Sequence, residues 1–498
     1  MSGRLLALAP LRIEAMAIGR GAPDAVVSRT GKGPARSARR AAALAAASPD
    51  VAAVAVAGVC GAVVAGIQPG DVVVATEVRG PDGTVVLPSP ALLVAALRRS
   101  GARVHVGPLA SSATMVRGAA RRALAASGVL GVDMESAWLT GVDWDRPVAV
   151  VRAVVDTPGR ELASASTVSG GLAALRALRR AAPVLEAWAA AAGPRRVLLA
   201  GPRSFCAGVD RAIVTVERAI ERYGAPVYVR RQIVHNRHVV ADLEGRGAIF
   251  VEELDEVPDG ATVVFSAHGV APVVRDEARR RGFSVIDATC PLVAKVHNEV
   301  RRFSAQGYQV VLIGHPGHDE IEGTLGEAPD LQVIEEVADV AGLECADGRV
   351  AYITQTTLAV DEVAGIVEAL QDRFPDVASP HSDDICYASQ NRQDAVRAMA
   401  ADCDILLVVG SRNSSNSTRL VEVARRHGCA AELIDDESGV ELSWLAGATT
   451  VGVTAGASAP PHLVLGVVDA LAGLGPLERE ERAVTTESVA FTLPPEVR

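Results

Sequence analysis

The feature that most constrains the fold is a layout that occurs three times after residue 195: an apolar strand-like run, a cysteine, and a helix-like run. Cys206 follows "RVLLAG", Cys290 follows "FSVI", and Cys386 comes directly before "YASQNRQDAVRAMA". The three cysteines are 84 and 96 residues apart, about the size of one small α/β unit. The layout predicts three α/β units about a common axis, with three strand-to-helix joints and three thiols at the centre.

A boundary between two larger parts lies in "APVLEAWAAAAGPRRVLLAG". An Ala-rich helix ends there at Gly193 and Pro194, and a new strand begins. The chain has 498 residues and is too long for one ordinary domain. We therefore expect one domain at 1–193 and another at 195–498. The first part also alternates strands with Ala- and Arg-rich helices, so both domains are predicted to be α/β.

Composition narrows the classes of function. Hydrophobic residues make up 49% and charged residues 22%, as in soluble globular proteins, and the net charge of −10 disfavours nucleic acid and anionic membranes as partners. The uncharged stretch 51–70 is about as long as a membrane span, but its Ala and Gly content favours two buried strands interrupted by Gly58 and Gly61. Because no secretory signal is evident, we expect a cytoplasmic protein whose seven cysteines are reduced thiols or metal ligands.

Three converging thiolates could hold an iron–sulfur cluster or a zinc ion. Each of the three cysteines is predicted at a helix N-terminus, whose partial positive charge should lower the pKa of the thiol. The spacing alone leaves two alternatives open. Each cysteine could be a small buried core residue, or the three could bind a structural zinc ion, which would leave the protein colourless.

Polar side chains follow several other strand-like runs. Histidines beside glycines end such runs in "IVHNRHVV", "FSAHGV" and "IGHPGHDEIEGT", and histidines that can be charged near neutral pH suit an anion. The loop "GSRNSSNSTRL" comes between a strand and a helix, where hydroxyls and backbone N–H groups can bind phosphate. The alternative for this loop is ordinary helix capping. "ITQTTL" and "VTAGASAPPHLV" add further hydroxyls after strands.

These motifs, with "FCAGVDRAI", "DATCPLVAKVH" and "ICYASQNRQ", occur in one order from Arg195 to Arg498. The second part therefore resembles the 4-hydroxy-3-methylbut-2-enyl diphosphate reductase family. The resemblance implies a [4Fe–4S] cluster held by Cys206, Cys290 and Cys386. It also implies isopentenyl and dimethylallyl diphosphate as products, and a ferredoxin- or flavodoxin-type electron donor.

The same resemblance implies roles for the polar residues. Glu320 would be the proton source, Thr356 would hold the substrate hydroxyl, and His318 would relay a proton or bind substrate. The residues implied to bind the diphosphate are His235, His268, Ser414, Asn416 and Ser458, with Ser415 beside them.

The first part resembles the nucleoside phosphorylase/nucleosidase superfamily, in particular its hopanoid-associated phosphorylases. The motifs that carry this resemblance are "SRTGKGPARS", "GVDMESAWL" and "VVRAVVDTPG". It implies that Glu135 binds ribose, that Met134 packs on the sugar, and that Asp156 protonates a purine as general acid. Val155 stands where the nucleosidases usually have serine.

The partners implied for the first part are a purine nucleoside and phosphate. The candidates for the phosphate pocket are Gly31, Gly33, Ser111 or Ser112, and Thr114, while Glu14 matches an acidic position that activates water in hydrolytic members. A second hypothesis makes this domain a non-catalytic ligand-binding or assembly module.

Overall fold

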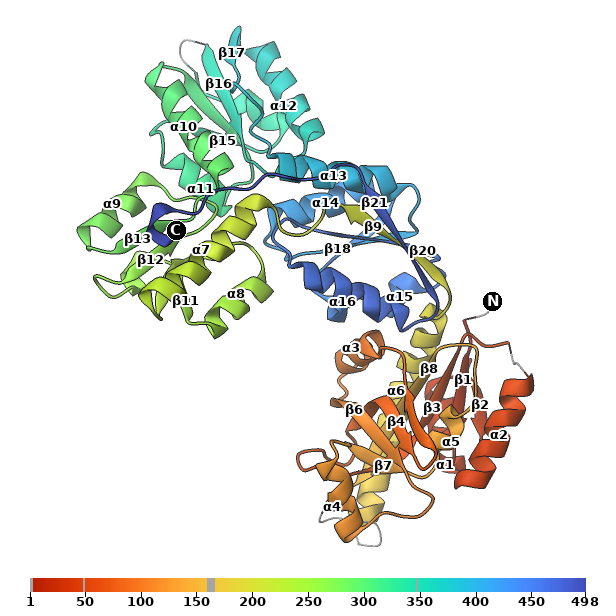
Figure 1. The fold of residues 1–498 in the computed structure, drawn as a ribbon. Coiled ribbons are helices and arrows are strands. Elements are labelled where there is room, and N and C mark those ends of the chain that lie inside the picture. The colour runs from red at the N-terminus through yellow and green to blue at the C-terminus, as the bar shows by residue number, and fades with distance from the viewer. Residues whose placement is uncertain (1–2, 48–49, 159–165, 346–347) are drawn as a thin grey trace. The chain divides into compact units, whose positions relative to one another are not determined.

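The computed structural model describes residues 3–47, 50–158, 166–345 and 348–498. It divides into two compact units (Figure 1). The first consists of Met1–Val197, Asp436–Val451 and Leu465–Arg479, and the second of Leu198–Asp435, Gly452–Val464 and Glu480–Arg498.

The main division, after Val197, lies beside the predicted boundary at 193–195. The two later segments group with the first unit because they contact it, as where α15 (Leu442–Leu445) packs against α6 (Ser166–Ala191). A sequence pattern read along the chain does not reveal such a contact. None of the helices in the described ranges combines the length and apolar character that a membrane span requires.

The first unit contains an eight-stranded mixed sheet in the order β2-β1-β3-β7-β6-β4-β5, and β8 pairs with both β3 and β4. Its strands are β1 Leu5–Ala9, β2 Val26–Arg29, β3 Ala53–Ala62, β4 Val72–Gly80, β5 Gly83–Val86, β6 Val104–Ser111, β7 Gly131–Asp133 and β8 Val148–Asp156. Its other helices are α1 Arg12–Gly21, α2 Pro34–Ala47, α3 Ala91–Arg99, α4 Gly118–Ala126 and α5 Ser136–Thr140. Because β1, β3 and β8 run parallel, their carboxyl ends meet at one edge of the sheet.

The prediction of two strands within 51–70 was wrong, because that stretch forms one strand, β3, followed by a loop. The glycines within it serve close packing. A Cβ at Gly58 would lie 2.3 Å from Arg152 Nη1, and a Cβ at Gly61 would lie 2.5 Å from Asp156 Oδ1. Both positions therefore have to be glycine, because any larger side chain would collide with Arg152 or Asp156.

The second unit contains the three α/β units that the repeated layout predicts (Figure 1). The sheet orders are β11-β10-β12-β13, β15-β14-β16-β17 and β19-β18-β20-β9-β21. The strands are β9 Arg195–Gly201, β10 Val227–Arg230, β11 Ala248–Val251, β12 Thr262–Phe265, β13 Ser284–Asp287, β14 Gln309–Ile313, β15 Gln332–Ile334, β16 Arg349–Thr354, β17 Asp376–Ala378, β18 Ile405–Val409, β19 Ala430–Ile434, β20 Thr450–Ala455 and β21 Leu477–Ala483. The principal helices are α7 Ala207–Tyr223, α8 Arg237–Gly245, α9 Pro272–Arg280, α10 Pro291–Ala305, α11 Asp319–Leu325, α12 Val360–Arg373, α13 Tyr387–Ala400 and α14 Ser415–Arg426. α16, Pro461–Ala472, begins in the second unit, and most of it belongs to the first.

Each of the three repeated cysteines is the N-cap residue of a helix. Cys206 precedes α7, Cys290 precedes α10 and Cys386 precedes α13. Proline at the first position of α10 favours this start, because its missing N–H group would have no partner within the helix. The structure therefore confirms the predicted position of each thiol at a helix N-terminus.

The first turn of α14 lies unusually close to the ends of β18 and β20. A Cβ at Gly410 would lie 2.1 Å from Ser417 Oγ and 2.6 Å from its Cβ, and a Cβ at Gly456 would lie 2.0 Å from the same hydroxyl. Two glycines at the ends of neighbouring strands thus admit the helix. This close approach fixes the loop that contains Ser414.

We predict that Gly410→Ala lowers the stability of the second unit by about 1–3 kcal/mol, because the added methyl group would overpack against Ser417. The measurement is the shift of the unfolding transition of the full chain in denaturant. Gly365→Ala is the matched control: Gly365 lies in α12, and a Cβ there meets only one atom, at 3.8 Å. The control should be neutral or stabilising, and equal behaviour of the two variants would contradict the prediction.

Candidate functional sites

The three repeated cysteines line one cavity of the second unit. Cys206 and Cys290 contribute sulfurs that both lie within 4 Å of one point, the position of a Cβ at Gly208, at 3.9 and 2.6 Å. A side chain at Gly208 would therefore fill the space between the thiols. Cys386 Sγ accepts from the backbone N–H of Ser389 at 3.3 Å and lies 3.1 Å from its hydroxyl. Three sulfurs that converge from three helix N-termini could hold a metal centre.

The expectation that helix N-termini lower the pKa values of these thiols was wrong for two of them. Burial raises the pKa of Cys290 to about 12 and that of Cys386 to about 11. For both, removal from water opposes thiolate formation more strongly than nearby N–H donors favour it. Deprotonation of these thiols therefore requires a positive partner such as a metal ion.

Glu320, near the start of α11, faces the same cavity and is almost fully buried. Its Oε1 accepts from the Thr356 N–H at 2.7 Å, and its Oε2 accepts from the Thr356 hydroxyl at 2.9 Å. Burial raises the pKa of Glu320 to about 7, although the two bonds from Thr356 favour the charged form. A carboxyl group with such a pKa can hold a proton near neutral pH and give it up.

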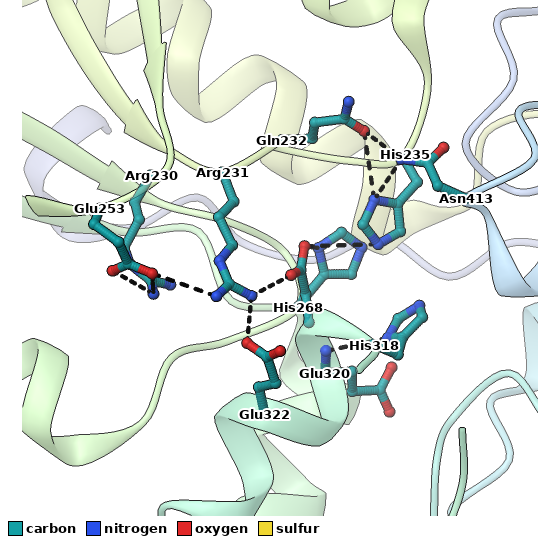
Figure 2. Close-up of polar contacts among 11 residues, drawn as sticks. Arg230, Arg231, Gln232, His235, Glu253, His268, His318, Glu320, Glu322 and Asn413 are labelled. Carbon is teal, nitrogen blue, oxygen red and sulfur yellow. Dashed lines mark hydrogen bonds and ion pairs between the residues drawn. The ribbon is translucent and has the colours of Figure 1, made fainter. Parts of the chain in front are cut away.

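Three histidines gather on another side of the cavity (Figure 2). The rings of His235 and His268 are stacked with centroids 4.1 Å apart, and His318 meets their edges at 5.1 and 5.7 Å. His318 Nδ1 accepts from the Glu320 N–H at 3.1 Å, so the proton of the neutral ring is on Nε2.

Burial lowers the pKa of all three histidines: to about 4 for His318, well below the usual value for His268, and downward for His235. The expectation of charged histidines near neutral pH is therefore wrong, because burial favours the neutral form of each ring. An anion bound here would bring the negative charge that favours their protonation.

Sequence reasoning missed the charged residues behind these histidines. Arg231 donates to Asp319 and forms an ion pair with Glu322 at 2.6 Å (Figure 2). Asp319 Oδ2 lies 3.8 Å from His235 Nε2 and 3.9 Å from His268 Nδ1. A divalent cation could also use this arrangement, because all three ligand atoms lie within 4.8 Å of one another. Asp319 lies in one quoted motif and Arg231 two residues before another, but only the fold shows that they meet.

The predicted hydroxyl and amide residues line the cavity as well. Ser414 is the N-cap of α14, Ser458 Oγ donates to the His235 carbonyl at 3.0 Å, and Ser415 accepts from the Thr357 hydroxyl at 2.9 Å. Asn416 accepts from the Ala457 N–H at 2.9 Å. Ser414 therefore caps the helix and also lines the cavity, so capping and the predicted binding role are compatible.

A second cavity lies in the first unit, at the carboxyl edge of β1, β3 and β8. Of the predicted residues it is lined by Glu14, Thr114, Met134, Glu135 and Asp156. The other candidates for a phosphate pocket, Gly31, Gly33, Ser111 and Ser112, do not line this cavity. The Gly33 N–H donates to Glu135 Oε1 at 3.1 Å, and the Ser111 hydroxyl donates to Asp133 at 2.5 Å.

Buried charged side chains line this second cavity or lie directly beside it. Arg152 is fully buried and pairs with Asp133 at 2.7 Å, while its Nη1 has no hydrogen-bond partner among the described residues. Glu14 accepts from the N–H groups of Val59 and Leu11 at 2.9 and 2.6 Å. Burial raises the pKa of both Glu14 and Glu135, and the charge of Arg152 opposes that rise.

Asp156 is paired with an arginine that sequence reasoning also missed. Arg121, from α4, donates to Asp156 Oδ2 at 2.9 Å and to Oδ1 at 3.2 Å, and both side chains are buried. Arg121 lies in an alanine-rich helix whose several arginines look alike in sequence. Arg121 thus contacts both oxygens of this carboxylate, in the bidentate geometry of an arginine–carboxylate pair.

Comparison with known proteins gives two family matches. Residues 197–472 match the LytB protein family, and residues 12–187 match the Phosphorylase superfamily. The 4-hydroxy-3-methylbut-2-enyl diphosphate reductase of Cutibacterium acnes is 58% identical over 307 residues, 61% of this chain and 95% of the relative. The enzyme of that name from Bordetella pertussis is 57% identical over 61% of this chain and 94% of its own. The solved E-1-hydroxy-2-methyl-but-2-enyl-4-diphosphate reductase of Plasmodium falciparum superposes with a TM-score of 0.59 at 36% identity, over 61% of this chain and 97% of its own.

We predict that Glu320 is about half protonated near pH 7 and loses its proton as the pH rises further, because its raised pKa is about 7. An infrared titration of the full chain should show the C=O stretch of a protonated carboxyl group that Glu320→Gln removes. Glu322→Gln, which changes a partly exposed carboxyl on the same helix, is the control and should leave this band in place. A band that is already absent at pH 5 would contradict the prediction.

Proposed function

The chain belongs to the LytB protein family, which includes 4-hydroxy-3-methylbut-2-enyl diphosphate reductases, and from that premise we propose that residues 195–498 reduce 4-hydroxy-3-methylbut-2-enyl diphosphate to isopentenyl and dimethylallyl diphosphate. One observation carries the proposal. Three thiols, a buried carboxyl group with a pKa near 7, and a group of histidines and hydroxyls all line a single cavity. The reaction needs these three kinds of group together: an electron source, a proton source and a site for an anion.

The proposed holder of the cofactor is the set Cys206, Cys290 and Cys386. The residues fit a cluster because the three sulfurs face one cavity and the absence of a side chain at Gly208 leaves room between two of them. When bound there, a [4Fe–4S] cluster would supply two electrons and polarise the C–O bond of the substrate's hydroxyl group. We also propose a ferredoxin- or flavodoxin-type protein as the electron donor.

Glu320 is the proposed proton source for the departing hydroxyl. Its pKa of about 7 lets it carry a proton at neutral pH, and Thr356 fixes the orientation of both carboxyl oxygens. The Thr356 hydroxyl is close enough to Glu320 to share one hydrogen-bond network with the substrate hydroxyl. His318, bound through Nδ1 to the Glu320 backbone, presents Nε2–H as a further donor.

The proposed diphosphate site consists of His235, His268, Ser414, Asn416 and Ser458, with Ser415 beside them. Because burial lowers the pKa of the histidines, their rings contribute little positive charge to the site. Bound diphosphate would raise these pKa values, so protons would be taken up as the substrate binds. Asp319 and Arg231, which do not line the cavity, would hold the histidine rings in place.

For residues 1–193 we propose cleavage of the glycosidic bond of a purine nucleoside, with phosphate or water as acceptor. The supporting observation is a cavity that Glu135 and Met134 both line, with Glu135 anchored by the Gly33 N–H, as a ribose site requires. Glu14 lines the same cavity, and it is the proposed acceptor of a proton from an attacking water. The cavity therefore supports water as the acceptor as well as phosphate.

We predict that Cys206→Ser, Cys290→Ser and Cys386→Ser each lose the cluster and reductase activity, because each removes one of three ligands. Iron and sulfide should be measured in each variant after anaerobic reconstitution of the full chain. Cys403→Ser and Cys429→Ser are controls, since these thiols lie outside the cavity lining. A full iron content in Cys290→Ser would show that the assignment is wrong.

Glu320→Gln should lower reductase turnover by about 10²–10⁴-fold with little change in KM, because glutamine keeps hydrogen bonds to Thr356 but has no proton to deliver. The assay uses the full chain with a strong chemical reductant, so that electron delivery does not limit the rate. Glu322→Gln is the control on the same helix. Turnover within twofold of wild type would exclude Glu320 as the proton source.

The nucleoside proposal is tested by product analysis of the full chain with a panel of purine nucleosides, with and without phosphate. Glu135→Ala should damage both binding and rate, because the ribose hydroxyls lose their anchor. Release of free ribose identifies a hydrolase, and ribose 1-phosphate a phosphorylase. The absence of base release from every nucleoside, in a protein with full reductase activity, would favour the binding-module alternative.

A further inference from the structure

This inference rests on the nucleoside-cleaving function proposed for the first unit and concerns the end of its cavity where the base would lie. Asp156 terminates β8 there, and Arg121 reaches it from α4. Besides its two bonds to the carboxylate, Arg121 donates to the Asp156 carbonyl at 3.2 Å and, through Nε, to the Ala62 carbonyl at 2.7 Å. Both side chains also line the cavity, so the pair faces the ligand and is not a remote structural bridge.

Gly61 of β3 leaves the space that this pair occupies. A Cβ at Gly61 would lie 2.5 Å from Asp156 Oδ1 and 2.7 Å from Arg121 Nη2, so only glycine leaves room for it. Arg121 and Asp156 are 3% and 6% exposed, and a buried charge of either kind needs the other. The pair is therefore a fixed element of the cavity wall.

Other charged and titratable groups line the same cavity and face this pair from several elements. They are Glu14 on α1, Lys32 after β2, Cys60 on β3, and Asp133 and Glu135 at the end of β7, with Arg152 of β8 beside them. Arg152 is paired with Asp133, and burial raises the pKa of the Cys60 thiol, which leaves it neutral. Among the described residues, Arg121 donates to both carboxylate oxygens of Asp156.

We propose that Arg121, and not a proton on Asp156, binds the ring nitrogen on which negative charge develops as the base departs, and that Asp156 acts as a hydrogen-bond acceptor. A guanidinium group has five N–H donors. Among the described residues, the contacts to Asp156 and Ala62 account for four of them. One donor of Nη1 remains for a ligand, next to the Asp156 carboxylate.

The step balances without a proton from Asp156. The bond between ribose C1′ and the base nitrogen breaks, and its electron pair goes to the base, whose ring nitrogen accepts the Arg121 N–H. Water, or phosphate, adds to C1′, and the proton of an attacking water goes to Glu14. The departing base then takes a proton from solvent. Because Arg121 only donates a hydrogen bond, we expect slower turnover than a general acid would give.

A hydrogen-bond donor, Arg121, beside an acceptor, Asp156, also determines which purine base the site prefers. The exposed edge of a 6-aminopurine presents an acceptor, N7, next to a donor, the N6 amine, whereas a 6-oxopurine presents two acceptors, N7 and O6. The Arg121–Asp156 pair is complementary to the first edge, and it would place O6 of the second against a carboxylate. A protonated Asp156 without its arginine could donate to either edge. The structure therefore favours adenine-bearing nucleosides over hypoxanthine-bearing ones.

The test compares wild type, Arg121→Gln, Arg121→Lys and Asp156→Asn in the full chain, with Arg122→Gln as a matched control. Arg122 is the next residue of the same helix and is exposed. Two quantities are measured: release of base from adenosine and inosine between pH 5 and 9, and equilibrium binding of adenine and hypoxanthine. Reductase activity of each variant reports that the chain is folded, and Arg121→Lys keeps the buried charge if Arg121→Gln does not fold.

If Arg121 is the donor, wild type should cleave adenosine in preference to inosine, with a rate that does not fall toward pH 9. Arg121→Gln should lower the rate of adenosine cleavage by about 10²–10³-fold and reduce the ratio of the adenosine rate to the inosine rate. Asp156→Asn should lower the adenosine rate less. A rate that falls with rising pH, together with a larger loss in Asp156→Asn than in Arg121→Gln, would overturn the inference in favour of a general acid. If no nucleoside is cleaved, the cleavage proposal fails, but binding still decides the inference. Adenine bound more tightly than hypoxanthine, and only while Arg121 is present, supports it, and equal binding overturns it.

Discussion

The second unit depends on one constraint: helices begin where parallel strands end, and their first backbone N–H groups have no partners within the helix. Cys206, Cys290 and Cys386 each occupy the N-cap position at such a joint. The same constraint brings Ser414 to the start of α14 and His318 to the start of α11. Backbone N–H donors at the starts of several helices can bind an anion. The cavity proposed as the reductase site lies at these helix starts.

Burial then decides which groups carry charge. The cavity raises the pKa of Glu320 and of the Cys290 and Cys386 thiols, and it lowers that of the three histidines. All of these shifts favour the neutral form, because the surroundings exclude water. The side chains of the cavity therefore contribute little charge of their own, and the proposed cluster and diphosphate would supply the charge.

The first unit differs from the second, because its buried charged side chains are already paired with side chains of opposite charge. Arg152 is held by Asp133, and Arg121 is held by Asp156, with glycines in β3 making room for both arginines. Such pairs contribute little net stability, but breaking one is costly. They fix the donors and acceptors of the cavity in one pattern, which suits the proposed recognition of a nucleoside by hydrogen bonding.

The sequence by itself determined the local architecture: the α/β class, the three helix starts at cysteines, and the residues of the reductase cavity, because strand periodicity, glycine and capping chemistry act over a few neighbouring residues. It could not determine how burial would set the pKa values, nor that β3 is one strand. Arg121 and Asp156 are 35 residues apart in the chain, and Arg231 and Asp319 are 88 apart. Only the tertiary structure decided these pairings, because the sequence around an arginine does not indicate which distant carboxylate folding will place beside it.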